Sequence, residues 1–257
     1  MFRLISRHQR ETIWELAKTD IKLRYQGSFL GIFWVFLKPL GVFLVLNFVF
    51  STYFNHTPNY PAKLITGIIL WSLFADATMK GMTSLVVKSH ILKKVYMPKW
   101  EIVVAAVLHS GVVFFFNLII LFFFLLFYYK IVPSPIFIFL FFYYVLQIYL
   151  ISVVFSFFTS SIYARLRDLD QVWELLLQIL FYATPIIFPI EILPENIRSI
   201  VNLNPMTFII QRSRIVLIDQ TLVNISYDLI FTAILLAGLF AGVVFFNKNT
   251  RFLVEKM

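Results

Sequence analysis

The chain has 257 residues, of which 60% are hydrophobic and only 14% are charged, and its mean hydropathy is +0.86. A soluble domain carries about 25% charged residues, so this composition excludes an ordinary soluble protein and indicates an integral membrane protein. The formal net charge of +9 follows the connectors between apolar runs, which argues against a nucleic-acid partner. Cysteine is absent, which excludes disulfides and thiolate metal sites.

The amino-terminal residues 1–28 are predicted to form a cytoplasmic amphipathic helix in the membrane interface. Between residues 12 and 22, apolar side chains recur at helical spacing, while lysine and other polar residues fill the opposite face. Gln26-Gly27-Ser28 ends this helix, and Trp34 follows as an interfacial aromatic anchor. Proline is favoured at the first position of a helix, so we expect Pro39 to begin the first spanning helix.

The rest of the chain predicts an all-α integral membrane fold with six transmembrane helices in one transmembrane domain, 1–257. Residues 29–190 would hold spans one to five, 191–228 a periplasmic hairpin, 229–247 span six and 248–257 a cytoplasmic tail. The predicted spans are 39–54, with a start that could lie within 29–37, then 64–85, 101–129, 136–163, 172–188 and 229–247.

Lysine and arginine in the short connectors predict the orientation, because cytoplasmic connectors carry more of them. Fifteen lie on the side of the termini and five on the other, which predicts a multi-pass membrane protein with both termini in the cytoplasm. The fifteen are Arg3, Arg7, Arg10, Lys18, Lys22, Arg24, Lys88, Lys93, Lys94, Lys99, Arg165, Arg167, Lys248, Arg251 and Lys256; the five are Lys63, Lys130, Arg198, Arg212 and Arg214.

The region 191–228 is predicted to form two short helices rather than a further span. One helix would cover 194–203, and Asn204-Pro205 would supply the N-cap and first residue of a second, 205–217. Thirteen residues extend about 20 Å, which is short of the roughly 30 Å apolar core of a bilayer. A seventh span would also place the basic tail outside, so we expect a re-entrant hairpin in the outer leaflet.

Taken in order, these features resemble the membrane subunits of type-2 ABC exporters, above all those that export O-antigen and other lipid-linked polysaccharides. The resemblance runs through essentially the whole chain. It rests on the basic in-plane helix, Arg24 and Tyr25, Leu30-Gly31, Trp34, Pro39, Arg167-Asp168, Thr184-Pro185, Pro189, Pro194, Asn204-Pro205 and Arg212 with Arg214.

The resemblance implies a channel-forming subunit of the bacterial inner membrane that forms a homodimer and works with two copies of a separate ABC ATPase subunit. The implied cargo is an undecaprenyl-pyrophosphate-linked glycan, and membrane lipid is the other partner. The same fold could export teichoic acid, capsule, a drug or a lipid instead. A membrane enzyme acting on polyprenyl phosphates, or a passive channel, would be an alternative of another class.

The sequence offers no catalytic, cofactor or metal-binding constellation. It contains no G-x-x-x-x-G-K-[ST] motif for ATP phosphates, and its four histidines have no metal-ligand spacing. Asp76 and Glu101 are the main carboxylates near or within spans. Asp76 lies four residues before Lys80, which predicts an ion pair, and Glu101 lies where it could cap span three.

By the resemblance, cytoplasmic elements dock onto the ATPase subunits. A short surface helix is expected within 89–98, and the connector 164–171 would supply a second contact. Plain membrane binding by basic residues is the alternative role. The candidate coupling residues are Ile91, Leu92, Lys93, Lys94, Pro98, Arg165, Arg167 and Asp168.

The proposed cargo path rests on aromatic residues, which form 19% of the chain. Most of the phenylalanines are expected to face lipid or pack between helices, but aromatic faces also suit the apolar C–H faces of sugars. By the resemblance, the first and fifth segments line the path at a two-fold interface, which gives Phe33, Trp34, Tyr182 and Phe188 as path residues.

Charged residues suggest two further sites. Arg24 and Lys38 flank the bend beside Trp34 and could bind the lipid pyrophosphate headgroup, with simple snorkelling to the interface as the alternative. The hairpin would supply a periplasmic gate formed by Pro194, Asn204, Pro205, Arg212 and Arg214.

Overall fold

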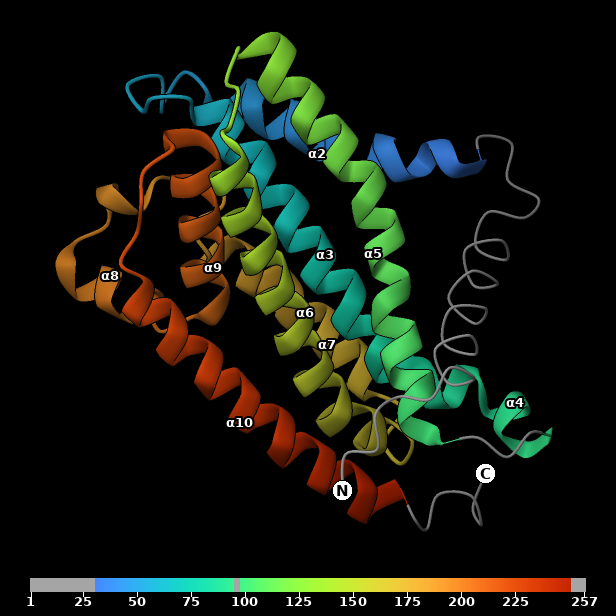
Figure 1. Ribbon diagram of the computed structural model, residues 1–257. Helices are drawn as coiled ribbons and strands as arrows, with labels where there is room; N and C mark the ends of the chain where they lie inside the picture. Colours follow the sequence, from blue (N-terminus) through green and yellow to red (C-terminus); the bar gives the residue numbers. More distant parts are fainter. Residues whose placement is uncertain (1–30, 95–97, 251–257) are drawn as a thin grey trace.

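The computed structural model describes residues 31–94 and 98–250, without the side chains of Ile32, Lys93 and Lys94. The in-plane helix predicted for 1–28, with Arg24, and the tail beyond Thr250 lie outside these ranges. Every regular element within them is helical, which confirms the all-α fold. Figure 1 shows one end of the bundle, here called the outer end, with connectors 51–59 and 129–134; the opposite, inner end holds connector 164–168 and the end of the last helix.

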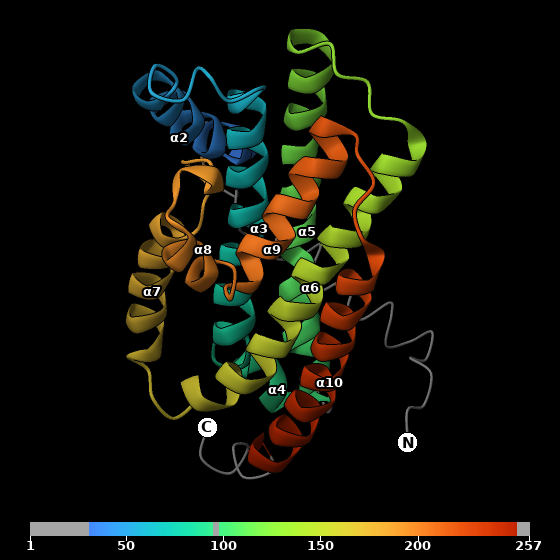
Figure 2. The same ribbon diagram turned by 90° about the vertical axis from the view of Figure 1, so that its left-hand side faces the viewer.

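Four helices are long and apolar enough to cross a membrane. They are α3 (Tyr60–Val87), α5 (Lys99–Phe123) with its π-helical extension η2 (Phe124–Tyr128), α6 (Pro135–Tyr163) and α10 (Ile225–Thr250). Predicted spans two, four and six fall within these helices, and predicted span three extends one residue beyond η2. In Figures 1 and 2, α3 and α6 run from the outer to the inner end, whereas α5 runs in the opposite direction.

Helix α3 is the centre of the bundle. Of an 18-residue apolar segment in each helix, 72% is buried in α3, against 33% in α5 and α6 and 17% in α10. Small residues permit this close packing: a Cβ added at Gly81 would collide with the side chain of Ser156 on α6, so only glycine fits there. A helix buried on nearly all sides organises the helices around it, because each of them packs against a part of its surface.

Helix α2 (Trp34–Phe50), preceded by the 3-10 turn η1 (Gly31–Phe33), packs along only the outer half of α5. Ring pairs Phe36–Phe116 at 5.8 Å and Phe43–Phe124 at 5.3 Å fix this alignment. Helix α2 begins at Trp34, within the earlier range 29–37 that the sequence also allowed, so the expectation that Pro39 itself begins the helix is wrong. Proline has no N–H, so it cannot donate to the carbonyl of Val35, one turn earlier.

Helix α7 (Leu169–Ala183) starts at the inner end and stops before it could reach the outer one. Its 15 residues extend about 22 Å, against a roughly 30 Å apolar core. The predicted bounds 172–188 are therefore wrong at both ends: Thr184 is extended, as expected for a residue before proline. Trp173 anchors α7 through a 3.1 Å hydrogen bond from Nε1 to Thr78 Oγ1 of α3 and by stacking on Phe155.

The region after α7 contains two short helices, as predicted. The 3-10 turn η3 (Ile190–Ile192) leads to α8 (Glu195–Val201), and α9 (Pro205–Arg214) continues as the π-helical η4 (Ile215–Asp219). Asn204 is the N-cap of α9 and accepts a 2.9 Å hydrogen bond from Met206 N, which confirms its predicted role. Pro205 follows at the first helical position, where its missing N–H costs nothing.

Figure 2 shows α8 and α9 beside α7, with α9 running outward between α3 and α6. The inward faces of α9 and η4 are apolar and join the main core. The short helix α4 (Ser89–Lys94) lies at the inner end, where Leu92 packs against a second, smaller cluster that includes Leu85, Ile102 and Phe246. Figures 1 and 2 thus show α4 at the inner end, whereas α8 lies about half-way along the bundle and α9 runs from there toward the outer end.

Candidate functional site

A cavity of about 760 Å³ lies between α2, α3, α5 and α7. It brings together Trp34, Lys38 and Tyr182, three residues that the sequence placed at a headgroup site and along a cargo path. The side chains of Trp34, Lys38 and Tyr182 remain exposed, and Tyr182 is 66% exposed. Trp71 and Phe181 add further aromatic surface. The size falls within the roughly 300–1,000 Å³ of small-molecule sites.

Polar side chains line the same cavity near the middle of α3 and α5. Asp76 pairs with Lys80 at 2.5 Å, which confirms the predicted ion pair within α3. Ser110 and Asn117 project from α5, and both are almost completely buried. Polar groups at this depth of a spanning helix are costly in hydrocarbon, so their grouping around one cavity marks it as a functional-site candidate.

A second cavity, of about 600 Å³, lies at the outer end between the start of α3 and the hairpin. Phe188, a predicted path residue, and Arg214, a predicted gate residue, both line it. Lys63 and Asp219 form an ion pair at 2.9 Å beside it. Phe188 therefore lines a different cavity from Trp34 and Tyr182. Phe33 lines neither cavity, and its ring packs against that of Phe36.

Arg214 joins three backbone segments in the interior of the protein. Its Nε donates to the carbonyl oxygen of Lys63 at 2.8 Å, Nη1 to that of Pro185 at 2.7 Å and Nη2 to that of Ile186 at 2.8 Å. The side chain is 5% exposed. The planar fork of arginine matches such divergent carbonyls, which a lysine ammonium cannot do equally well. Arg214 therefore ties α9 to the chain that leaves α7 and to the start of α3.

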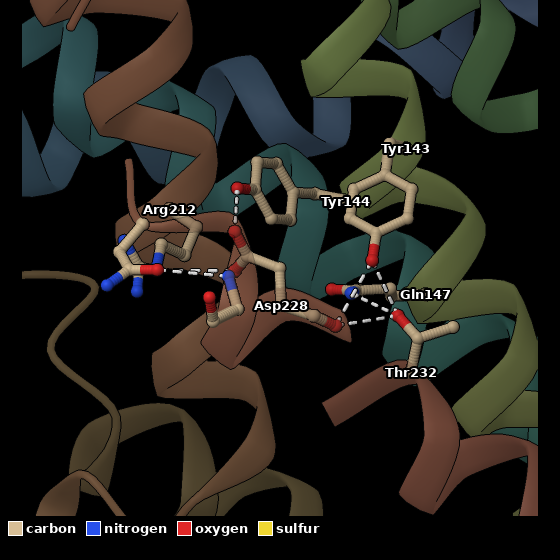
Figure 3. Close-up of polar contacts among 8 residues, drawn as sticks. Tyr143, Tyr144, Gln147, Arg212, Asp228 and Thr232 are labelled. Atoms are coloured by element: carbon tan, nitrogen blue, oxygen red, sulfur yellow. Dashed lines mark hydrogen bonds and ion pairs between the residues drawn. The ribbon is translucent and has the colours of Figure 1, made fainter. Parts of the chain in front are cut away.

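Arg212 belongs to a different polar cluster, shown in Figure 3, which joins α9, α10 and α6. Arg212 Nε lies 3.4 Å from Asp228 Oδ1, and the hydroxyl of Tyr144 donates to Asp228 Oδ2 at 3.1 Å. Thr232 Oγ1, one turn beyond Asp228, accepts from Gln147 Nε2 at 3.0 Å. The sequence missed this cluster, because Asp228 was assigned to the end of the hairpin and not to the last span.

The remaining hairpin residues form contacts rather than a charged site. Asn204 Nδ2 donates to Thr184 Oγ1 at 2.9 Å, which fastens the start of α9 to the end of α7. Pro194 is exposed and is the N-cap residue of α8. The five predicted gate residues thus divide among two interior polar clusters, a helix cap and one exposed turn.

The predicted coupling residues lie at the inner end. Arg165, Arg167 and Asp168 are exposed on the connector between α6 and α7, and Arg167 lies 5.6 Å from the ring centroid of Tyr163. Pro98 is exposed before α5. Ile91 and Leu92 are half-buried on α4, while the side chains of Lys93 and Lys94 lie outside the described residues.

The prediction that Glu101 caps span three is wrong. Glu101 lies in the first turn of α5 and is buried, but the N-cap residue is Pro98, which has no N–H for a carboxylate to accept from. Its Oε1 has no hydrogen-bond partner among the described residues. Within residues 31–94 and 98–250, no group of three or more histidines, aspartates or glutamates is arranged to hold a metal ion.

Comparisons with known proteins agree with this architecture. The profile of the ABC-2 type transporter family matches residues 11–218. A protein of Klebsiella pneumoniae named O-antigen export system permease protein RfbA is 30% identical over 240 residues, which cover 91% of this chain and 90% of that protein. A protein of the same name from Myxococcus xanthus is 25% identical over 262 residues, covering both chains completely. The chain therefore belongs to the ABC-2 type transporter family.

Proposed function

We propose that this protein is the channel-forming membrane subunit of an exporter that moves a lipid-linked, O-antigen-like polysaccharide across the bacterial inner membrane. The observation that carries the proposal is its similarity to O-antigen export permeases over nine-tenths of both chains. The protein would form a homodimer, and two copies of a separate ABC ATPase subunit would supply the energy. The glycan would be carried on undecaprenyl pyrophosphate.

The proposed topology has six passes, with the inner end of the bundle in the cytoplasm. Lys88, Lys99, Arg165, Arg167 and Lys248 gather at that end, which supports this orientation by the positive-inside rule. Helices α2 and α7 would complete the six passes, although each is shorter than the four long helices. Helices α8 and α9 would form the periplasmic re-entrant hairpin, supported by the burial of α9 against α3 and α6.

In this proposal the lipid pyrophosphate binds near Lys38, with Arg24 as a second cation. The support is that Lys38 lines the same cavity as Trp34 and Tyr182. The glycan would then pass along aromatic surfaces of α2 and α7, with Phe33 and Phe188 extending the path. The hairpin, through Arg212 and Arg214, would close the outer side between transport events.

The ATPase subunits would act on the inner end through α4 and the connector 164–168. The exposure of Arg165, Arg167 and Asp168 supports this, because a docking surface must be accessible. Helix α7 begins directly after this connector, so a movement of the connector would be passed into α7 and on to Thr184 and Asn204.

Deletion of the gene in its own host tests the cargo. We expect loss of surface polysaccharide and accumulation of the lipid-linked glycan on the cytoplasmic side, both reversed when the protein is restored together with its ATPase subunit. Normal surface glycan in the deletion strain would refute polysaccharide export and favour another cargo, such as a drug or a lipid. Purification from native membranes should recover an ATPase subunit at one-to-one stoichiometry; its absence would refute the proposed partnership.

A further inference from the structure

Two buried polar atoms on α5 line the mid-depth cavity without a hydrogen-bond partner. Ser110 is 1% exposed and Asn117 is 3% exposed, and both line the cavity between α2, α3, α5 and α7. Neither Ser110 Oγ nor Asn117 Oδ1 has a partner among the described residues. Native proteins pair nearly all buried polar atoms, so two orphans on one cavity wall call for an occupant that can pair with them.

The two side chains are placed as a pair. They are seven residues apart on one helix, so they lie on the same face, separated by about 10 Å along its axis. Phe114 lies between them in the sequence and also lines the cavity. The result is a ledge on α5, consisting of Ser110, Phe114 and Asn117, in which an aromatic ring is flanked by two hydrogen-bonding groups.

The other walls of the cavity supply aromatic surface, together with the charged side chains of Lys38 and Asp76. Trp34 and Tyr182 are exposed to the cavity from α2 and α7, and Trp71 faces it from α3. Aromatic faces bind the apolar C–H faces of sugar rings, while hydroxyl and amide groups bind the sugar hydroxyls. A hydrocarbon chain would leave the ledge atoms unpaired, at the full desolvation cost of each.

We propose that this cavity is a saccharide-binding site, in which Ser110 and Asn117 hydrogen-bond the hydroxyl groups of one sugar unit of the glycan. This inference rests on the proposed export of a polysaccharide. The site would hold the glycan at the middle of the bilayer, where water is scarce and a hydroxyl-rich chain most needs replacement partners. Trp34 and Tyr182 would stack against the same sugar.

Photocrosslinking in cells that make the glycan tests the site whatever the identity of the sugar. The photoreactive residue p-benzoylphenylalanine replaces Tyr182, which lines the cavity and is exposed, so the replacement should leave the fold intact and keeps an aromatic ring at this position. The same residue in place of Phe115, which is 62% exposed and does not line the cavity, is the matched control. We expect a glycan-reactive adduct at position 182 and none at position 115.

The hydrogen-bonding groups of the ledge are then removed in the protein that carries the photoreactive residue at position 182. Ser110→Ala and Asn117→Leu should each reduce the glycan adduct about threefold to tenfold, as expected for the loss of one hydrogen bond. Ser160→Ala and Asn47→Leu are the matched controls, because Ser160 Oγ and Asn47 Oδ1 also lack a partner among the described residues but do not line this cavity. The controls should leave the adduct unchanged.

Three results would overturn the proposal: an adduct that contains phospholipid but no glycan, a glycan adduct that persists at full yield in both ledge variants, or an equal loss in the control variants. The first result would assign the cavity to a lipid headgroup. None of the three would affect the deletion assay, in which surface glycan is lost whether or not the ledge binds sugar. Failure of this inference is therefore distinguishable from failure of the proposed export function.

Discussion

The guanidinium of Arg214 occupies the space beside Gly67 that a methyl group would need. A Cβ built at Gly67 would lie 2.5 Å from Arg214 Nη2 and 3.2 Å from the side chain of Ile186. Glycine at this position of α3 therefore permits the arginine of α9 to reach the carbonyls of Pro185 and Ile186. The attachment of the hairpin to the central helix α3 therefore requires both the guanidinium of Arg214 and the absence of a side chain at Gly67.

Gly67→Ala should destabilise the protein, because the added methyl group displaces Arg214 from its carbonyl partners. We expect a loss of about 1–3 kcal/mol, as is usual for overpacking of a buried site. Gly41→Ala in α2 is the matched control, since a Cβ there meets nothing within 4 Å. Thermal unfolding of the two purified variants checks this; equal stability of both would contradict the close packing at Gly67.

Arg214→Lys should not replace the native residue, although it keeps the charge. A lysine ammonium cannot reach three divergent carbonyls with the fixed geometry of the guanidinium, and each carbonyl left unpaired costs about 1–3 kcal/mol. Limited proteolysis of the segment 184–204 should therefore accelerate. Arg165→Lys, at an exposed position, serves as the control and should leave the digestion pattern of that segment unchanged.

The pair of Arg212 and Asp228 should show strong coupling in a double-mutant cycle. Arg212→Met or Asp228→Asn alone disrupts an ion pair whose carboxylate side chain is only 2% exposed, and breaking a buried pair typically costs about 3–5 kcal/mol. Combining Arg212→Met with the same Asp228→Asn should recover part of the loss, because no uncompensated charge remains. Purely additive losses in thermal stability would show that the two residues act independently.

Asn204 should prove to have two separable roles. Asn204→Ala removes both the helix cap and the donor to Thr184, and each loss is worth about 1 kcal/mol. Asn204→Asp keeps the oxygen that accepts from Met206 N but loses the Nδ2 donor, so it should cost only about half as much. In the Asn204→Asp background, Thr184→Val should add less destabilisation than it does alone. A full, additive loss would contradict the contact.

Charge reversal at the inner end should impair coupling without affecting the fold. Arg165→Glu and Arg167→Glu change exposed residues, so the thermal stability of the membrane subunit should shift by less than about 0.5 kcal/mol. We expect loss of ATPase co-purification or of substrate-stimulated ATP hydrolysis. Lys130→Glu, exposed at the outer end, is the control and should retain both. Normal assembly and turnover in the arginine variants would remove this connector from the docking surface.

The sequence predicted the long apolar helices because their composition and length carry the information locally. It also predicted the Asn204-Pro205 helix start, since capping is a property of neighbouring residues. The two errors have different causes. Apolar residues on both sides of Pro39 hide the position at which α2 begins, whereas Glu101 does lie in the first turn of α5 but follows an N-cap proline that has no N–H to donate.

The site was predicted in part. Trp34, Lys38 and Tyr182 were selected separately, and the fold brings them to one cavity. Ser110 and Asn117 were missed because a single serine or asparagine within an apolar helix has no distinctive pattern, and only the neighbouring helices reveal what it faces. A search for polar residues at seven-residue spacing within spans would have found this pair.

The central position of α3 also limits how the protein can change shape. A helix that is buried on most of its surface cannot slide or rotate without repacking every neighbour at once, whereas α10, in which only 17% of an 18-residue apolar segment is buried, packs chiefly against α6. We therefore expect α3 to act as a fixed pivot during the transport cycle. Helix α10 would then move together with α6, because Tyr144 and Gln147 of α6 bind Asp228 and Thr232 of α10.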